Sequence, residues 1–490
     1  MGRTMTNEML QGYPDGGSSD DEMFDESGAF RDDYRELGEI LQRWTLDDHL
    51  QREERADLAL LSAGITFNVY SEEEGTERIF PFSLIPRIVG AQEWARVEAG
   101  LKQRLQALNQ FLLDVYGDQR IIKEGVVPEE IVLSSPGFRP EMSGFRPPLG
   151  IYAHIAGCDL VRDEQQGIVV LEDNLRTPSG VSYVLENRMV MLRVVPDLFP
   201  RWGVRAVADY PNQLLAMLLS VRPGDGGDPP RAVLLTPGIY NSAYFEHSFL
   251  SNQMGIPLVE GSDLTVGDDD YVYLRSTSGL ERIDVVYRRI DDDFLDPTVY
   301  RPDSMLGVPG LMRSYLNGHV TLVNAPGAGV ADDKVVYRWV PDIIRYYLDE
   351  DPILPNVETF SPLVPSELDH ICAHARELVI KPANESGGYG VLIGEQASTA
   401  ELEDTLAQVK QEPRNWIAQP LLQFSTIPTF DGDQLKPRRA DLRPFVLSGQ
   451  DTWVIPGGLT RVALREGSYI VNSSQGGGSK DTWVLNEEPG

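Results

Sequence analysis

Residues 231–330 alternate short apolar runs with helical stretches, and this alternation constrains the fold more than any other feature of the chain. The strand-like runs are AVLLT (232–236), PLVE (257–260), DVVYRR (284–289) and VTLVN (320–324). Helical patterns at 241–253 and 305–317 separate some of these runs. Strands that alternate with helices predict an open, largely parallel α/β sheet.

Four more regions are expected around this sheet, because a chain of 490 residues is too long for one simple core. Residues 1–30 are rich in Gly, Ser, Asp and Glu, and they predict a disordered acidic tail. Residues 31–150 are mainly helical by pattern. Residues 151–230 contain a strand hairpin followed by a helix, and residues 331–490 have an α+β pattern of helices and short strands.

The net charge of −32 excludes some classes of protein. A strongly acidic surface repels phosphate backbones, so we expect neither nucleic acid nor an anionic membrane as a partner. The chain has no apolar run long enough to span a bilayer and no secretory leader, so a cytoplasmic location is the simplest expectation. The two cysteines, Cys158 and Cys372, suggest neither a disulfide framework nor a metal cluster. A nucleotide ligand would need a local cluster of Lys, Arg and metal.

The segment LVIKPANESGGYGVLIG (378–394) places a lysine and a glycine-rich loop between two strands. The first strand carries Lys381. The loop contains Ser386, Gly387, Gly388, Tyr389 and Gly390. Glycines let backbone N–H groups approach an anion closely, so the segment predicts a phosphate-binding loop. A glycine hairpin with a surface lysine explains the same pattern equally well.

Two further segments carry polar side chains on short strands. In WIAQPLL (416–422), Gln419 and Leu421 could present an amide and backbone groups to a flat base, although most edge strands look similar. In the stretch 440–480, the polar residues of interest are Asp441, Arg443, Arg461 and Asn472. The fork of an arginine side chain binds two oxygens of a phosphate or carboxylate. Solvated strand faces remain the alternative for each arginine.

The hairpin in GCDLVRDEQQGIVVLEDNLRTPSG (157–180) carries oxygen ligands that suit a metal. Glu172 and Asn174 are two residues apart on one strand and therefore share a face, and Asp159 lies on the preceding strand. Two carboxylates and an amide predict a Mg²⁺ site that bridges nucleotide phosphates. Hairpin acids of an acidic protein would give the same pattern.

Together these segments resemble the ATP-grasp superfamily, and particularly its ribosomal-protein glutamate ligase branch. VNAPGAGVADDKVVYRWV (323–340) resembles the segment that carries the first ATP lysine, here Lys334, and Pro355–Thr359 also fits. The Lys381 segment resembles the second lysine strand and its phosphate-covering loop. The Gln419 segment resembles the adenine hinge, although Pro420 replaces the usual acid. DLRPFVLS, with the later Arg461 and Asn472, resembles the strands of the catalytic arginine and asparagine.

The order of these elements resembles that of circularly permuted ATP-grasp proteins, type 2, which include the glutathionylspermidine synthetases. The Asp159 and Glu172-x-Asn174 piece, usually last, here comes first. IAGCDLVRD, LEDNLRTPSGVSYVLENR and VVYRRIDDDFLDP closely resemble a large, uncharacterised bacterial branch of that group. The resemblance covers about 31–485, and it implies a permuted ATP-grasp fold whose preATP-grasp-like subdomain is the α/β region.

The resemblance implies a carboxylate–amine ligase that uses ATP and Mg²⁺ and passes through an acylphosphate. It assigns catalytic roles to Arg443, Arg461, Asn472 and Arg176, with small-molecule or peptide substrates. Further candidates for substrate contacts are Ser179, Tyr183, Arg188, Arg288 and Arg289. Each of these could instead form a salt bridge with one of the many acids. A degenerate nucleotide-binding scaffold and a phosphotransferase on the same fold are the alternatives.

The permuted order also makes geometric predictions. Residues 157–174 and 440–472 should lie in one sheet, and residues 476–485 should end close to 150–157. Lys334 and Lys381 should flank one cleft, with Gln419 at its inner end.

Overall fold

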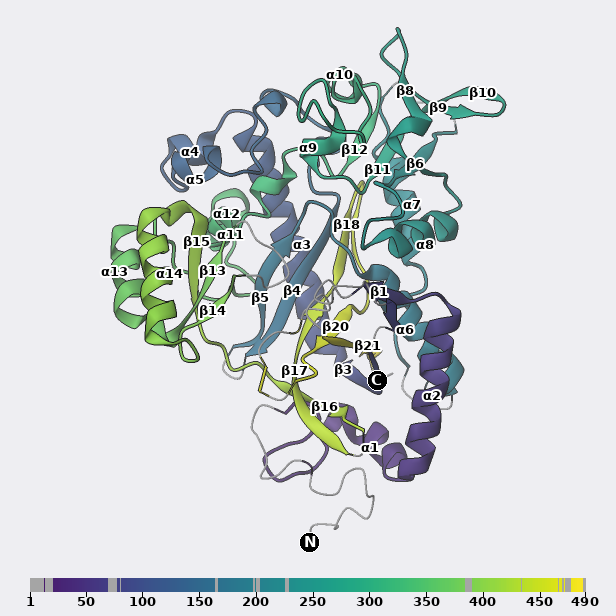
Figure 1. The fold of residues 1–490 in the computed structure, drawn as a ribbon, viewed down its shortest axis with the longest axis vertical. Coiled ribbons are helices and arrows are strands. Elements are labelled where there is room, and N and C mark those ends of the chain that lie inside the picture. Colours follow the sequence, from purple (N-terminus) through teal and green to yellow (C-terminus); the bar gives the residue numbers. More distant parts are fainter. Residues whose placement is uncertain are drawn as a thin grey trace.

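The computed structural model describes residue 13 and residues 21–68, 77–79, 81–163, 166–196, 199, 203–224, 229–383, 390–432, 434–465, 467–468, 471 and 477–487. A large sheet crosses the middle of the molecule, with an α/β unit at one end and a smaller α+β unit on one side (Figure 1). The family of folds implied by the sequence is therefore present: mixed α/β and α+β layers around a permuted sheet.

Nine strands form the central sheet. Their bounds are β3 Phe82–Val89, β4 Ile155–Asp163, β5 Gly167–Asn174, β16 Thr426–Phe430, β17 Leu435–Arg443, β18 Phe445–Ser448, β19 Thr452–Val454, β20 Leu459–Val462 and β21 Gly478–Val484. Their order is β19-β18-β4-β17-β20-β21-β3, with β5 beside β4 and β16 beside β17. Strand β4 lies between two strands from the far end of the chain, since Leu160 pairs with Leu442 and Ala156 with Val446. The two distant segments share one sheet, as the permuted order predicts.

The last strand, β21, does not lie next to β4. Strand β21 is separated from β4 by β17 and β20, and it pairs in parallel with β3. The expected proximity of residues 476–485 to 150–157 is therefore wrong. Strand β3 was hidden within a region of mainly helical pattern, because its run FSLIPRIV is buried on both faces and shows no alternation.

Residues 21–24 are buried against the core, so the prediction of a disordered tail is wrong for this part of the chain. Met23 and Phe24 are fully buried. Glu22 is buried too, and its carboxylate accepts hydrogen bonds from Arg87. Burial opposes ionisation of Glu22, but Arg87 and Arg162 lower its pKa to about 2. Acidic composition implied solvation here, whereas tertiary pairing with arginines keeps the segment in place.

Several helices make up most of the N-terminal region. They are α1 Arg35–Leu41, α2 Leu46–Ser62, α3 Ala91–Val115, α4 Arg120–Lys123 and α5 Glu129–Leu133, and a small hairpin of β1 Thr66–Asn68 and β2 Glu77–Ile79 accompanies them. Helix α2 begins after Thr45, whose hydroxyl and the Asp48 carboxylate form a capping box. Helix α3 buries more than half of its residues, including Trp94, and packs against α12 (Val340–Leu348).

The α/β unit contains the parallel sheet that the alternation predicts. Its strands are β6 Ala232–Leu235, β7 Leu258–Val259, β11 Val285–Arg288 and β12 Thr321–Val323, in the order β12-β11-β6-β7. All three pairings are parallel. Its helices are α7 Tyr210–Ser220, α8 Tyr244–Met254, α9 Asp292–Leu295 and α10 Leu311–Leu316. A small antiparallel sheet lies at its rim and consists of β8 Leu264–Val266, β9 Val272–Ser276 and β10 Gly279–Ile283. Helix α6 (Val181–Val194) lies between this unit and the hairpin of β4 and β5 in the chain.

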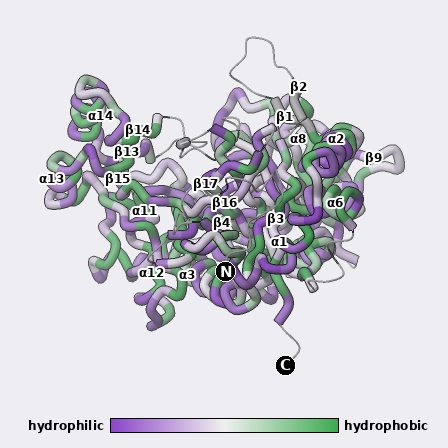
Figure 2. The backbone as a smooth tube through the Cα atoms, turned by 90° about the horizontal axis from the view of Figure 1, so that it is seen from below, coloured by the Kyte–Doolittle hydropathy of each residue, from purple (hydrophilic) through white to green (hydrophobic). Residues whose placement is uncertain are grey.

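The smaller α+β unit carries the second lysine segment. Its antiparallel strands are β13 Leu378–Pro382, β14 Leu392–Ile393 and β15 Trp416–Pro420, and its helices are α11 Lys334–Tyr337, α13 Pro365–His374 and α14 Thr399–Gln411. Along α13 and α14 the tube alternates between hydrophilic and hydrophobic colours, as expected of helices with one packed face (Figure 2). Among the described helices, none is long and apolar enough to cross a bilayer.

Candidate active site

The hairpin of β4 and β5 brings the three expected metal ligands together. Asp159 pairs directly with Glu172 across the hairpin, and Gly157 pairs with Asn174. Alternation along β5 puts Glu172 and Asn174 on one face. Asp173, between them, points to the opposite side and accepts hydrogen bonds from Arg104. The amide nitrogen of Asn174 donates to Gly157 O at 3.1 Å.

Asp159 is buried beneath two arginines from the far end of the chain. Its carboxylate accepts hydrogen bonds from Arg443 Nη2 and Arg461 Nη2, each at 2.7 Å. Burial raises the cost of the charge, but Arg443 and Arg461 hold the pKa of Asp159 well below its usual range. Arg461 also forms a buried ion pair with Asp441. Strands β17 and β20, which flank each other, deliver these partners.

Glu172 faces the first lysine. Its carboxylate lies 3.8 Å from Lys334 Nζ, and its side chain is one third exposed. Burial raises the pKa of Glu172, and the neighbouring charge of Asp159 adds to this shift. Lys334 is the first residue of α11, which begins where the Asp333 side chain accepts a hydrogen bond from Val335 N. A carboxylate with a raised pKa beside a lysine is a common arrangement at functional sites.

The second lysine lies beside the first. Burial lowers the pKa of Lys381 to about 8, and the charge of Lys334 contributes to this shift while that of Glu172 opposes it. Lys381 Nζ donates a hydrogen bond to Gln419 Oε1 at 2.6 Å. Four residues therefore meet at one place and connect the hairpin, α11, β13 and β15: Glu172, Lys334, Lys381 and Gln419.

Gln419 and Leu421, which were expected to form the adenine hinge, make hydrogen bonds to other parts of the protein. Gln419 Nε2 donates to Thr359 Oγ1 at 2.9 Å, so Gln419 bridges Lys381 and the Pro355–Thr359 segment. The backbone N–H of Leu421 donates to Glu377 O at 3.2 Å. Gly390 has a φ of +70°, which a glycine adopts without strain. Ser386, Gly387, Gly388, Tyr389 and Asn472 lie outside the described residues.

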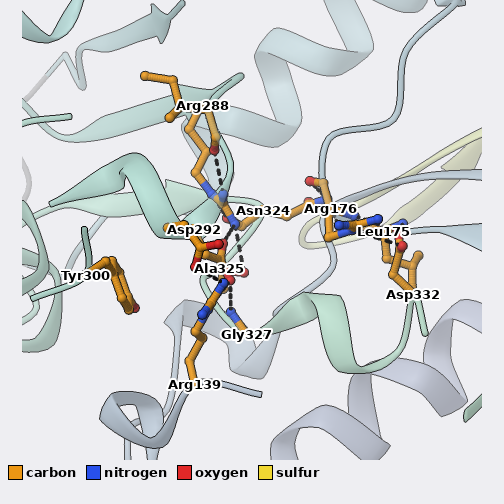
Figure 3. Close-up of polar contacts among 12 residues, drawn as sticks. Arg139, Leu175, Arg176, Arg288, Asp292, Tyr300, Asn324, Ala325, Gly327 and Asp332 are labelled. Carbon is orange, nitrogen blue, oxygen red and sulfur yellow. Dashed lines mark hydrogen bonds and ion pairs between the residues drawn. The ribbon is translucent and has the colours of Figure 1, made fainter. Parts of the chain in front are cut away.

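The loop after β5 is held by the carboxyl edge of the parallel sheet. Arg176 Nε donates to Asp332 Oδ1 at 3.0 Å, while Asn324 Nδ2 donates to Leu175 O at 2.7 Å and to Arg176 O at 3.2 Å (Figure 3). Arg289 Nη1 donates to Pro178 O at 2.7 Å. Asn324 and Asp332 were missed by the sequence reasoning, although both lie within the quoted segment of the first lysine.

Several side chains that were expected to contact the substrate form hydrogen bonds and ion pairs within the protein instead. Arg288 is buried and donates to Asn324 O and Ile290 O, each at 2.7 Å, while its Nη2 lies 2.6 Å from Asp292 Oδ1 (Figure 3). Arg289 pairs with Glu246 and also contacts Ser179. For these side chains the salt-bridge alternative holds, because each guanidinium already meets fixed acceptors.

Two other candidates lie away from the lysines. Arg188 pairs with Asp481 at 2.7 Å and donates to Thr482 O at 2.8 Å, so it fastens α6 to β21. Its assignment as a substrate contact is therefore wrong. The ring of Tyr183 stacks with Phe245 of α8, with ring centroids 6.1 Å apart. Arg176, expected to be catalytic, keeps a half-exposed side chain and lines a cavity together with Lys334.

Comparisons with known proteins agree with this architecture. The family model described as circularly permuted ATP-grasp type 2 matches residues 86–463. An uncharacterised protein of Synechocystis is 53% identical over 97% of this chain and 98% of its own length. A Frankia alni protein with a provisional glutamate–cysteine ligase name is 42% identical over 95% of this chain, a match that spans 53% of that protein.

A solved structure shares the fold. The glutathione synthetase-like effector of Globodera pallida superposes with a TM-score of 0.60 at 12% identity, covering 90% of this chain and 98% of the effector. At this identity the likeness concerns the fold alone. The family model covers most of the sequence, including the hairpin of β4 and β5, both lysines and both arginines. The chain belongs to the circularly permuted ATP-grasp type 2 family.

Proposed function

We propose that this protein is an ATP-dependent ligase that joins a carboxylate to an amine through an acylphosphate intermediate. The observation that carries the proposal is the meeting of Glu172, Lys334 and Lys381. They come from three separate elements, and the charge of each of the first two acts on the pKa of Lys381. The ligase name of the Frankia alni relative supports the same kind of reaction.

The chemistry needs positioning and charge neutralisation more than a protein nucleophile. A carboxylate oxygen of the substrate attacks the terminal phosphorus of ATP, and ADP leaves with the bonding electrons. The amine nitrogen then attacks the acyl carbon, phosphate leaves, and the nitrogen loses a proton to give the amide. Lys334, Lys381 and Arg443 supply positive charge where the phosphoryl group would move. Their clustering gives a protein of net charge −32 a local site for an anion.

The residues present fit a bound Mg²⁺. Glu172 and Asn174 offer carboxylate and amide oxygens on one face, and these are ligand types that Mg²⁺ accepts. The oxygens of Asp159 accept hydrogen bonds from Arg443 and Arg461, so Asp159 would act mainly by holding these arginines or would have to release one. A bound Mg²⁺ would neutralise phosphate charge during transfer.

Two other functions share this fold. A degenerate scaffold would have lost charged groups, whereas Asp159, Glu172, Lys334, Lys381 and Arg443 are all present and close together. A phosphotransferase would release a stable phosphorylated product instead of an amide. The nature of the product therefore separates these functions from a ligase.

The proposal is tested by incubating the purified protein with ATP and Mg²⁺ against a panel of amino acids, peptides and polyamines. ADP release is measured, and mass spectrometry identifies the product. We expect ADP release that requires both a carboxylate and an amine, with an amide of the summed mass less one water. A stable phosphorylated compound, or nucleotide binding without turnover for any pair, would contradict the proposal.

A further inference from the structure

A small cavity lies directly beside the first lysine. Its volume is about 180 Å³, and Lys334, Ala383 and Arg176 contribute to its lining. Ala383 directly follows β13, which carries Lys381, and Lys334 is 3.8 Å from Glu172, so the cavity borders the cluster of Glu172, Lys334 and Lys381. Typical ligand sites measure about 300–1,000 Å³, so this cavity suits a small molecule or one end of a larger one.

Charged side chains dominate the rest of the lining. These are Arg139, Asp291, Asp292, Asp293, Asp332 and Asp333. Three of the acids are fully engaged: Asp292 by Arg288 and Arg139, Asp332 by Arg176, and Asp333 by Arg414. They form the walls and are not free to bind a ligand.

Groups of both signs keep unused hydrogen-bonding capacity. Within the part of the chain that the structure describes, the carboxylate of Asp291 has no hydrogen bond or ion pair, and it is exposed. Asp293 has one ion pair, with Arg139 Nη2 at 2.7 Å, and is half exposed. Among the described residues, the Arg176 guanidinium is hydrogen-bonded through Nε alone, to Asp332, so its two Nη groups can still donate to a ligand. Asp332 and, to a smaller extent, Asp291 raise the pKa of Arg176.

One wall of the cavity is formed by closely packed backbone. A Cβ on Gly329 would lie 3.2 Å from Arg176 Cδ and from Gly137 Cα, and a Cβ on Gly137 would lie 2.3 Å from the carbonyl carbon of Gly329. The two glycines therefore pack backbone against backbone under the guanidinium stem of Arg176. The wall is close-packed, whereas the charged groups above it have unused hydrogen-bonding capacity.

We propose that this cavity binds the amine substrate and that this substrate is an α-amino acid. The inference rests on the proposed ligase function. Asp291, with Asp293 beside it, would hold the ammonium group, and the open Nη groups of Arg176 would hold the carboxylate in a fork. One acceptor and one donor, each with unused hydrogen-bonding capacity, within the same small cavity match a zwitterion. A polyamine would leave Arg176 facing a second positive charge.

The test measures amino-acid binding without requiring turnover. Isothermal titration calorimetry on the full-length protein, with Mg²⁺ and a non-hydrolysable ATP analogue present, uses each proteinogenic amino acid as the probe. For every amino acid that binds, the matching amine without the carboxylate and the matching acid without the amine are titrated next. The variants are Asp291→Asn and Arg176→Gln. The matched controls, Asp349→Asn and Arg313→Gln, alter exposed side chains outside the cavity.

We expect at least one amino acid to bind, with affinity at least about tenfold above both of its truncated analogues. Asp291→Asn and Arg176→Gln should each lower that affinity about tenfold or more, while both controls bind as the wild type does. Equal binding of the amine that lacks a carboxylate, or unchanged binding in Asp291→Asn, would overturn the inference. So would the absence of any amino-acid binding while the nucleotide analogue still binds.

The two proposals fail in different ways. If wild-type protein does not bind the ATP analogue, the proposed ligase function itself is refuted. If the analogue binds and a polyamine supports amide formation without any amino acid, only the assignment of this cavity is refuted. If Arg176→Gln does not fold, Asp291→Asn still decides the question, because the exposed carboxylate it alters has no hydrogen bond to lose among the described residues.

Discussion

The carboxylate of Glu172 lies 3.8 Å from the ammonium nitrogen of Lys334. Glu172 is on the hairpin of β4 and β5, which the permutation moves to the front of the chain, and Lys334 is the first residue of α11. Their contact joins the two parts of the permuted chain at one point. Burial and Asp159 raise the pKa of Glu172, so the protein maintains a carboxylate where its charge is costly.

Lys381→Met should weaken ATP binding by about tenfold or more, because one charge-assisted contact to phosphate is lost. The methionine keeps most of the volume of the side chain, so the melting temperature should change little. Equilibrium titration with a fluorescent ATP analogue measures the effect. Lys410→Met, which alters an exposed lysine on α14, is the control, and equal affinity in both variants would contradict the assignment of Lys381.

ATP affinity should decline as the pH rises through about 8. Burial lowers the pKa of Lys381 to about 8, so above this pH the lysine is increasingly neutral and attracts phosphate less. Below it the charge is present and affinity is highest. Titrations between pH 6.5 and about 9.5 test this prediction. In Lys381→Met the decline around pH 8 should disappear, and its persistence there would assign it to another group.

Neutralising the two cross-strand carboxylates should have opposite effects on stability. Glu172→Gln removes a carboxylate whose pKa is raised. The free energy of unfolding at pH 7 should therefore stay the same or increase. Ligase activity should fall about a hundredfold. Asp159→Asn leaves Arg443 and Arg461 without their shared partner and should destabilise by about 3–5 kcal/mol. Urea unfolding of both variants provides the comparison. A less stable Glu172→Gln would argue that Glu172 has a structural role.

Arg104→Met should destabilise the fold by about 3–5 kcal/mol, because it leaves Asp173 charged and unpaired in the core. Both side chains of this ion pair are buried, at 2% and 1% exposure. The control is Arg313→Met, which breaks an exposed pair with Asp270 and should cost about 0–1 kcal/mol. Similar unfolding midpoints for the two variants would show that Arg104 contributes little.

Local patterns were sufficient to predict much of the architecture. The alternation at 231–330 predicts the parallel sheet, and the order of motifs predicts that residues 157–174 and 440–472 share one sheet, in which β4 lies between β17 and β18. Strand β3 escaped detection because a strand buried on both faces has no polar alternation. The packing of Met23 and Phe24 escaped as well, since composition cannot show that Arg87 lies opposite Glu22.

The roles of individual arginines were harder to predict. Arg443 is close enough to Glu172 to affect its pKa, and Arg176 lines a cavity together with Lys334, whereas Arg188 and Arg288 are engaged by internal acceptors. An arginine after a strand has the same local sequence in both situations. Its role depends on which carboxylates and carbonyls the tertiary fold brings within reach. The acids at 291–293 were part of a quoted motif, but only the cavity beside Lys334 gives them a role.

The central claim is that a carboxylate oxygen becomes bonded to the phosphate of ATP, and isotope transfer tests this most directly. The carboxylate substrate found in the product screen is labelled with ¹⁸O in both oxygens and incubated with ATP, Mg²⁺ and the amine. Mass spectrometry then measures the label in the released phosphate and in the amide. An acylphosphate predicts one ¹⁸O in each phosphate and one in each amide. Phosphate without label, with turnover intact, would contradict it.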